Sequence, residues 1–505
     1  MLIIYYFFCS VNKWLTLFTF FKKTVLKQSA FYYIICVSYI IEGDIMEQKN
    51  TNKKFYSSFF IMLLTIAMQN VLVYGVNLAD NIMLGKFSEV SMAGAGLVNQ
   101  IQFLLQMLIT GTGEGIIVIA ARHWGEGDIP SIKRVSSVGM RFGLAFSGIM
   151  FVLALFFPEA VLGILTNDES LIAESAKYLR IIAFTYPIFA VTNILIATMR
   201  SVETSKIGFY ISISTIITNV SLNYVLIFGK LGFAPMGIRG AAVATLIARL
   251  LELLIVITYV TFFDKKLHLK LRDYVTSNGD MLKRFVKTSV PVIMSSASWG
   301  IAMGLQTAIL GRLDGAIGAN SISSTVFSIV TVFIYGSSTA AGVALGKMIG
   351  ENKKAIENGK LTFEKSKAEI KKRAKTLQCI FISLGILTSV TLFILKDVII
   401  GFYDITESTK LLANSFMTVL CVTVIGTSYQ MPSLTGIIRA GGETSFVFYN
   451  DLIFMWGIVL PSSFIAAFVL ELSPVIVFCC LKADQILKCG VAVFKVNRFN
   501  WIKDI

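Results

Sequence analysis

The stretch "SSFFIMLLTIAMQNVLVYGVNLADNIMLGK", Ser57 to Lys86, is an apolar run that carries one carboxylate, Asp80, near its end. About 20 consecutive apolar residues suffice for a helix to cross the hydrocarbon core of a bilayer. Similar runs recur along the chain of 505 residues, of which 55% are hydrophobic and only 15% charged. One water-soluble core cannot hide so much apolar surface, so the sequence predicts an all-α integral membrane protein.

Twelve such runs follow Met46. They are long and uninterrupted, unlike the short alternating strands of an outer-membrane barrel. Charged residues, glycines and prolines mark their ends. The predicted transmembrane helices are 57–84, 93–120, 136–158, 177–199, 206–228, 239–263, 287–310, 319–345, 376–395, 409–437, 446–470 and 474–494.

The formal charge of +15 is distributed unevenly over the links between these helices. Lysine and arginine gather in the links after the even-numbered helices, whereas 159–176 and 471–473 contain neither. The positive-inside bias therefore predicts that both termini are cytoplasmic. This placement also argues against a nucleic-acid partner. The clustered residues are Arg122, Lys133, Arg134, Arg200, Lys206, Lys265, Lys266, Lys270, Arg272, Lys283, Arg284, Lys287, those of the run 347–375, Arg439, Lys495, Arg498 and Lys503.

The two halves of the chain match each other after a shift of about 225 residues. "GTGEGIIVIAARHWGEGD" at 111–128 aligns with "GSSTAAGVALGKMIGENK" at 336–353. "RSVETS" at 200–205 aligns with "RAGGETS" at 439–445 after one insertion. Each half holds six predicted helices. Because six is even, both halves start on the same side of the membrane, and the repeats are parallel.

The repeat predicts an N-lobe over 46–262, a basic cytoplasmic linker over 263–287, and a C-lobe over 288–505 with a basic cytoplasmic tail. Two equivalent lobes enclose a central cavity, and rocking one lobe against the other exposes that cavity to each side in turn. This is the architecture of a secondary transporter. We expect the linker to be amphipathic or flexible, and to face solvent or lipid headgroups.

Several segments resemble the bacterial multidrug and toxic compound extrusion (MATE) family. They include "VNLADNIMLGKFSEVSMAGAGLVNQ", "NVSLNYVLIFG", "GIRGAAVATLIAR", "RAGGETSF" and "NDLIFMWGIVLP", and the resemblance runs from about Met46 to the C-terminus. It implies an antiporter of the bacterial plasma membrane that exports organic cations and amphipathic drugs in exchange for H+ or Na+. We expect a monomer surrounded by membrane lipid, with no cofactor besides the coupling ion. The sequence contains no Gly-x-x-x-x-Gly-Lys-Ser/Thr loop that would indicate an ATP-driven pump.

The resemblance also implies a cation-coupling site in the N-lobe. It consists of Asp80 on the first helix, Asn219 and Asn223 on the fifth, and Thr245 on the sixth. Asn219 and Asn223 share a helix face because they are four residues apart. Many members of the family carry an acid where this chain has Asn223, so the site has one carboxylate. An acid at membrane depth is costly when ionised and is usually retained for ion or proton transport, which predicts a coupling role for Asp80. The alternative is that Asp80 lies near the outward end of its helix and is hydrated at the membrane interface.

Four other polar residues are candidates for the cargo cavity or for polar sites in the C-lobe: Glu114, Gln306, Asp451 and Asp484. Glu114 either faces cationic cargo or is a locally paired acid. Asp484 either forms an ion pair with Lys488, four residues on, or takes part in ion or cargo binding. Gln306 occupies the region of the seventh helix where some members of the family have an acid.

Two other classes of function compete with the antiporter. A flippase for lipid-linked oligosaccharide or cell-wall precursors has a similar fold, but its cavity carries basic residues, whereas the deep charges here are mostly acidic. An intramembrane enzyme needs a nucleophile with a base, or metal ligands. The seven cysteines form no Cys-x-x-Cys pair, and we expect His123 and His268 to be solvated residues of cytoplasmic links, so no metal site is predicted.

Residues 1–45 form a patchy apolar extension without a clean signal-peptide pattern. "EGDI" stands directly before Met46, and a purine-rich message for Glu-Gly-Asp resembles a ribosome-binding site. We therefore expect Met46 to be the true start and 1–45 to be a translated leader.

Overall fold

The computed structural model describes residues 48–275, 279–313, 315–401 and 406–502, and within these ranges it contains helices and no strands. The predicted leader, 1–45, lies outside them. The chain divides into two units, Met1–Ser57 and Ser58–Ile505, and the two lobes described below belong to the second, which holds α3 from Ser58 onward. The elements are α3 (Gln48–Phe87), α4 (Glu89–Glu126), α5 (Ile129–Phe156), α6 (Pro158–Gly163), α7 (Glu169–Ile182), α8 (Thr185–Ser201), α9 (Lys206–Phe228), α10 (Ile238–Thr258), η1 (Tyr259–Phe263), α11 (Leu271–Val275), α12 (Gly279–Leu310), α13 (Ala316–Val330), α14 (Val332–Glu357), α15 (Phe363–Gly401), α16 (Glu407–Met431), η2 (Pro432–Ile438), α17 (Thr444–Leu452), η3 (Ile453–Val459), α18 (Leu460–Phe464), η4 (Ile465–Val469), α19 (Pro474–Leu481) and α20 (Asp484–Arg498).

Among the described residues, 10 helices are long and apolar enough to cross a membrane, or up to 11 if α7 and α8, which are bent by 49°, form one span. The all-helical membrane class is confirmed. The predicted spans 206–228, 239–263, 409–437 and 446–470 agree with the observed helices to within two residues, whereas α3, α4, α5, α12 and α15 extend further than predicted. Three of the twelve predicted helices are interrupted. They are 177–199 between α7 and α8, 319–345 between α13 and α14, and 474–494 between α19 and α20.

The break between α13 and α14 has a visible local cause. The Thr331 hydroxyl donates hydrogen bonds to the carbonyl oxygens of Phe327 (2.7 Å) and Ser328 (3.3 Å). A threonine that bonds back to the preceding turn competes with the helical backbone pattern and bends the helix. Pro432 starts the wide π-helical stretch η2 because it lacks the backbone N–H of a regular α-helix.

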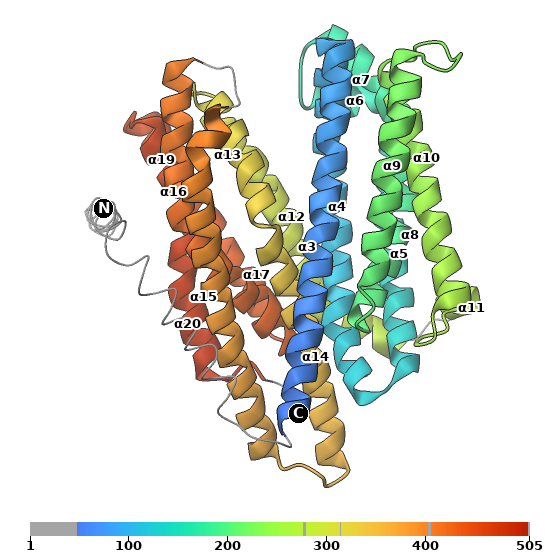
Figure 1. Cartoon of the computed structure of the whole chain (residues 1–505), viewed down its shortest axis with the longest axis vertical. Coiled ribbons are helices and arrows are strands. Elements are labelled where there is room, and N and C mark those ends of the chain that lie inside the picture. Colours follow the sequence, from blue (N-terminus) through green and yellow to red (C-terminus); the bar gives the residue numbers. More distant parts are fainter. Residues whose placement is uncertain (1–47, 276–278, 314, 402–405, 503–505) are drawn as a thin grey trace. The chain divides into compact units, whose positions relative to one another are not determined.

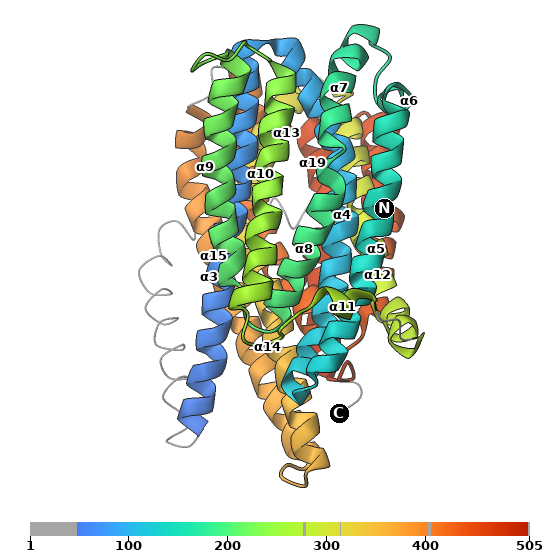
Figure 2. The same cartoon turned by 90° about the vertical axis from the view of Figure 1, so that its right-hand side faces the viewer.

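The N-lobe (α3 to η1) and the C-lobe (α12 to α20) stand side by side (Figure 1), and a quarter turn places the N-lobe helices in front of the C-lobe (Figure 2). Helix α4 joins them. It packs on α5 and α8 of its own lobe and on α12 and α14 of the other. The second predicted transmembrane helix, α4, is therefore the main contact between the lobes.

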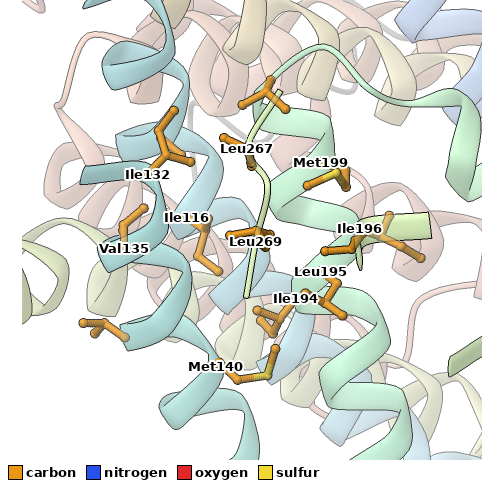
Figure 3. Close-up of a cluster of buried hydrophobic side chains, with 14 of the residues drawn as sticks. Ile116, Ile132, Val135, Met140, Ile194, Leu195, Ile196, Met199, Leu267 and Leu269 are labelled. Carbon is orange, nitrogen blue, oxygen red and sulfur yellow. The ribbon is translucent and has the colours of Figure 1, made fainter. Parts of the chain in front are cut away.

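The linker between the lobes is anchored at its start. Leu267 and Leu269 are 1% and 4% exposed, and both belong to a core cluster with Ile132 and Met199 (Figure 3). The Asp264 carboxylate accepts the backbone N–H groups of 266–268, which turns the chain toward this core. The sequence predicted a solvated or headgroup-facing segment, but its leucines alternate with charged residues, so one side packs on the N-lobe.

Candidate functional site

The four residues expected to form the N-lobe site lie together. The Asn223 amide donates to an Asp80 carboxylate oxygen and, over 3.1 Å, to Asn219 Oδ1. Asn219 donates in turn to the Thr245 hydroxyl over 3.3 Å. We call these four residues the amide cluster. Its members come from α3, α9 and α10, and the spacing of four residues puts both asparagines on one face of α9.

Burial leaves the amide cluster with spare oxygen atoms. Asn219 and Asn223 are 1% and 0% exposed, and Asn223 Oδ1 has no hydrogen-bond partner. Carboxylate and amide oxygens are the donors that hard cations prefer, and a carboxylate can take a proton instead. The chemistry of this cluster thus fits a proton or a small hard cation at Asp80.

A cation missed by sequence reasoning lies near the amide cluster. Arg249 on α10 is close enough to Asp80 for their charges to interact, while its guanidinium bonds Glu252 over 2.7 Å. It also stacks at 5.0 Å over the Phe189 ring. The spacing of three residues between Arg249 and Glu252 in an apolar span is the sequence pattern that indicates this ion pair.

Glu114 forms an ion pair between the lobes. Its Oε2 accepts a hydrogen bond of 2.6 Å from Arg439 Nη1, and the side chains are 36% and 4% exposed, respectively. Glu114 lies in α4, and Arg439 follows η2 in the other lobe. The sequence left open a locally paired acid or a cavity acid, and the structure gives Glu114 a partner 325 residues away.

Arg439 connects Glu114 to a chain of charged groups in the C-lobe, which we call the ionic chain. Arg439 Nη2 donates to Ser295 Oγ (3.3 Å), which donates to Asp451 Oδ2 (2.5 Å). Lys488 binds the other Asp451 oxygen at 3.0 Å and Asp484 at 3.4 Å. The expected pair of Asp484 and Lys488 is present, but Lys488 also links it to α17.

Gln306 stands apart from both groups. It is 5% exposed, and its amide donates to the Met455 sulfur over 3.4 Å. Lys482, in the break between α19 and α20, is buried against the rings of Phe327 and Phe478. The structure therefore does not bring Gln306 into contact with the other candidate residues.

The links rich in lysine and arginine lie at one end of the lobes, which we call the basic end. There α4 and α14 cross closely, because a Cβ on Gly125 would collide with the Lys347 carbonyl and one on Gly350 with the Arg122 carbonyl. Arg122 and Lys347 are matched by the repeat shift, and so are the two glycines. Each half thus uses the same positions to contact the other.

Polar bonds reinforce this crossing. Arg122 Nε donates to the Ala440 carbonyl over 2.9 Å, and Lys347 binds Glu203 at 2.6 Å. Ala440 and Glu203 lie in the two matched segments that follow α8 and η2. Burial alone would raise the pKa of Glu203, but hydrogen bonds from Lys347 and Ser58 hold that pKa below its usual value. We call the crossing and these bonds the clasp.

His123 corrects one expectation from the sequence. The sequence predicts a solvated link residue, but His123 is 5% exposed within α4, and its Nδ1 lies 2.9 Å from Glu126 and 3.4 Å from Asp128. Helix α4 continues beyond the predicted end of its apolar run, so His123 faces the lobe interior. Glu126 also binds Lys353 of α14 at 3.2 Å, so this group of residues lies next to the clasp. His268 is exposed, as expected.

Comparisons with known proteins agree with this architecture. Residues 65–225 match the MatE family model. The chain is 25% identical over 433 residues to the uncharacterized transporter YisQ of Bacillus subtilis, covering 83% of this chain and 88% of that one. It is 25% identical over 408 residues to a probable multidrug resistance protein NorM of Photorhabdus laumondii, covering 78% and 83%.

A solved structure shares the fold. It is the outward-facing conformation of a multidrug resistance MATE family transporter of the MOP superfamily, with a TM-score of 0.77 and 16% identity. The match covers 91% of this chain and 98% of that one.

Proposed function

Because this chain belongs to the MATE family of transporters, we propose that it exports organic cations and amphipathic drugs, driven by inward flow of H+ or Na+. Members of this family are secondary transporters rather than enzymes. The two lobes alternate between two arrangements that expose the cargo site to opposite sides of the membrane. The coupling ion and the chemical class of the cargo are part of the proposal.

The amide cluster carries this proposal. A carboxylate among neutral amide and hydroxyl groups in an apolar span is costly to keep ionised, so a proton or a bound cation lowers that cost. Asp80 would take up its ion when the N-lobe is open to the outside. It would release the ion when the lobes rearrange and water reaches Asp80 from the other side.

The proposed orientation puts the basic end in the cytoplasm of a bacterial cell, facing inward across the plasma membrane. With the clasp closed, the basic end is sealed by contacts between α4 and α14. The conformation described here would then open outward. Candidate residues along the cargo path are Glu114, Gln306, Asp451 and Asp484. Among the three acids, the Glu114 side chain is the most exposed.

The test is export of a fluorescent organic cation from proteoliposomes under an imposed pH gradient or an imposed Na+ gradient. Wild type should export under one gradient, and Asp80→Asn should not. Glu159→Gln is the matched control, because Glu159 forms an exposed pair with Arg180 and is expected to leave export unchanged. Export by Asp80→Asn at the wild-type rate would refute the coupling role.

A flippase for anionic lipid-linked precursors is the second candidate, and buried cations favour it. Arg200 bonds the neutral Gln69 amide, and Lys482 packs on two aromatic rings. Such groups suit the phosphates of a lipid-linked precursor. If no gradient drives export of any cation tested, translocation of a fluorescent lipid-linked diphosphate sugar is the measurement that supports this candidate.

A further inference from the structure

The pair of Glu114 and Arg439 is asymmetric in its exposure. The Arg439 side chain is 4% exposed, whereas the Glu114 side chain is 36% exposed. Part of the Glu114 surface is thus accessible although its Oε2 is held at 2.6 Å by a guanidinium. A positively charged group arriving from solvent would meet the carboxylate and not the arginine.

Arg439 is also linked to a second carboxylate through a hydroxyl group. Its Nη2 already donates to Ser295 Oγ at 3.3 Å, and Ser295 donates to Asp451 at 2.5 Å. If Glu114 were taken by another cation, the Arg439 guanidinium would still have the Ser295 hydroxyl and, through it, the Asp451 carboxylate. Leaving Glu114 therefore does not strand the guanidinium without an acceptor, which is the usual reason that a buried ion pair resists separation.

The pair is not duplicated by the repeat. Arg439 is matched by Arg200, but Glu114 is matched by Thr339 in α14. Glu114 also lies close enough to Arg200 and to the Tyr335 hydroxyl for electrostatic interaction. One carboxylate therefore lies near two arginines at the contact between the lobes.

We infer that Glu114 binds the positive group of the cargo, and that Arg439 is an internal cation that holds this carboxylate when cargo is absent. This inference rests on the proposed export of cations. The ligand class is a monovalent amphipathic organic cation. Cargo displaces Arg439 toward Ser295 and Asp451, and thereby removes an ion pair that ties α4 to the segment after η2, so binding and the contact between the lobes are linked.

The experiment measures binding of a fluorescent monovalent organic cation to the purified full chain in detergent by fluorescence anisotropy. Glu114→Gln should weaken binding by about tenfold or more, because a charged hydrogen-bond partner is lost. Arg439→Gln should strengthen binding by about threefold or more, because the competing cation is gone. The double variant should bind like Glu114→Gln, and Glu159→Gln like wild type.

Arg439→Lys guards against a variant that fails to fold. It keeps the charge but loses the planar guanidinium, so it should compete less well and bind cargo with an affinity between those of wild type and Arg439→Gln. Size-exclusion profiles and unfolding temperatures identify the variants that fold. If Arg439→Lys and Arg439→Gln bind cargo no more tightly than wild type, Arg439 is a structural partner only and the inference is overturned.

The same measurements separate this inference from the proposed function. If wild type exports cations and Glu114→Gln binds them as tightly as wild type, export stands and the inference fails. If wild type neither binds nor exports any cation tested, both fail together.

Discussion

The amide cluster and the ionic chain occupy the two lobes, yet they surround their carboxylates in opposite ways. Asp80 is bonded to the neutral amide of Asn223, whereas Asp451 is bonded to Lys488 and, through Ser295, is linked to Arg439. A carboxylate with neutral partners lacks a fixed counter-charge in contact and can take one from solution. A carboxylate with a buried lysine already has one. The two lobes thus balance the charge of a buried carboxylate in different ways, and under the proposed function only the N-lobe carboxylate exchanges an ion with solution.

The strongest test of this division is to neutralise each acid separately. Asp80→Asn should reduce ion-driven export to the rate of empty liposomes while changing the unfolding temperature little, because an amide can still bond Asn223. The measurement is export and thermal unfolding of the same preparation. Loss of stability together with export would show that Asp80 is structural, and would remove the contrast between the lobes.

Asp451→Asn should mainly reduce stability, whereas Asp80→Asn mainly reduces export. Removing one partner of a buried ion pair leaves Lys488 short of counter-charge, so the free energy of unfolding should fall by roughly 2 to 4 kcal/mol, with Asp484 limiting the loss. Denaturation in detergent measures this change. The double variant Asp451→Asn, Lys488→Met should recover much of the stability. If it is less stable than the single variant, the pair is not the cause.

The clasp sharpens the comparison because here the two halves use the same geometry. Gly125→Ala and Gly350→Ala should each reduce the free energy of unfolding by about 1 to 3 kcal/mol, because each added methyl meets a backbone carbonyl of the opposite lobe. The two losses should be similar. Gly148→Ala is the control, since nothing lies near its added methyl. A large effect at only one of the two matched glycines would contradict the equivalence.

The smallest expected effect concerns pH at Glu203. Its folded-state pKa is lowered, so the pair with Lys347 contributes stability that is complete above the ordinary glutamate pKa of about 4.3 and is lost as pH falls through the lower folded-state pKa. Glu203→Gln should remove this contribution, about 1 kcal/mol or less. Unfolding temperatures between about pH 7 and pH 3.5 should fall more steeply for wild type than for the variant. Parallel curves would contradict it.

Helix positions could be predicted from the sequence because apolar length is a local property. The breaks between helices could not be predicted, because they depend on contacts of individual side chains rather than on the length of an apolar run. Thr331 bonds back to its own turn, and Lys482 interrupts an apolar stretch by being buried against aromatic rings. The buried leucines of the linker were also missed, because charged neighbours dominate their local composition.

The candidate sites were predictable to different degrees for a similar reason. Asp80 stands out as the one carboxylate of an apolar run, and the resemblance supplied its partners Asn219, Asn223 and Thr245. Arg439, in contrast, reaches Glu114 across 325 residues, and no local pattern indicates that contact. The sequence pattern showed that Glu114 has no matching acid in the second half of the chain. That pattern identified Glu114 as unusual but did not identify Arg439 as its partner.

The clasp has a consequence for how such a molecule can be assembled. Arg122 and Gly125 on one helix face Lys347 and Gly350 on the other, so the contact is nearly isologous, with the same surface patch used on both sides. An isologous contact does not require two different sequences. Two separate copies of a six-helix half-chain bearing this patch would meet through it in the same way, related by a two-fold axis along the membrane normal.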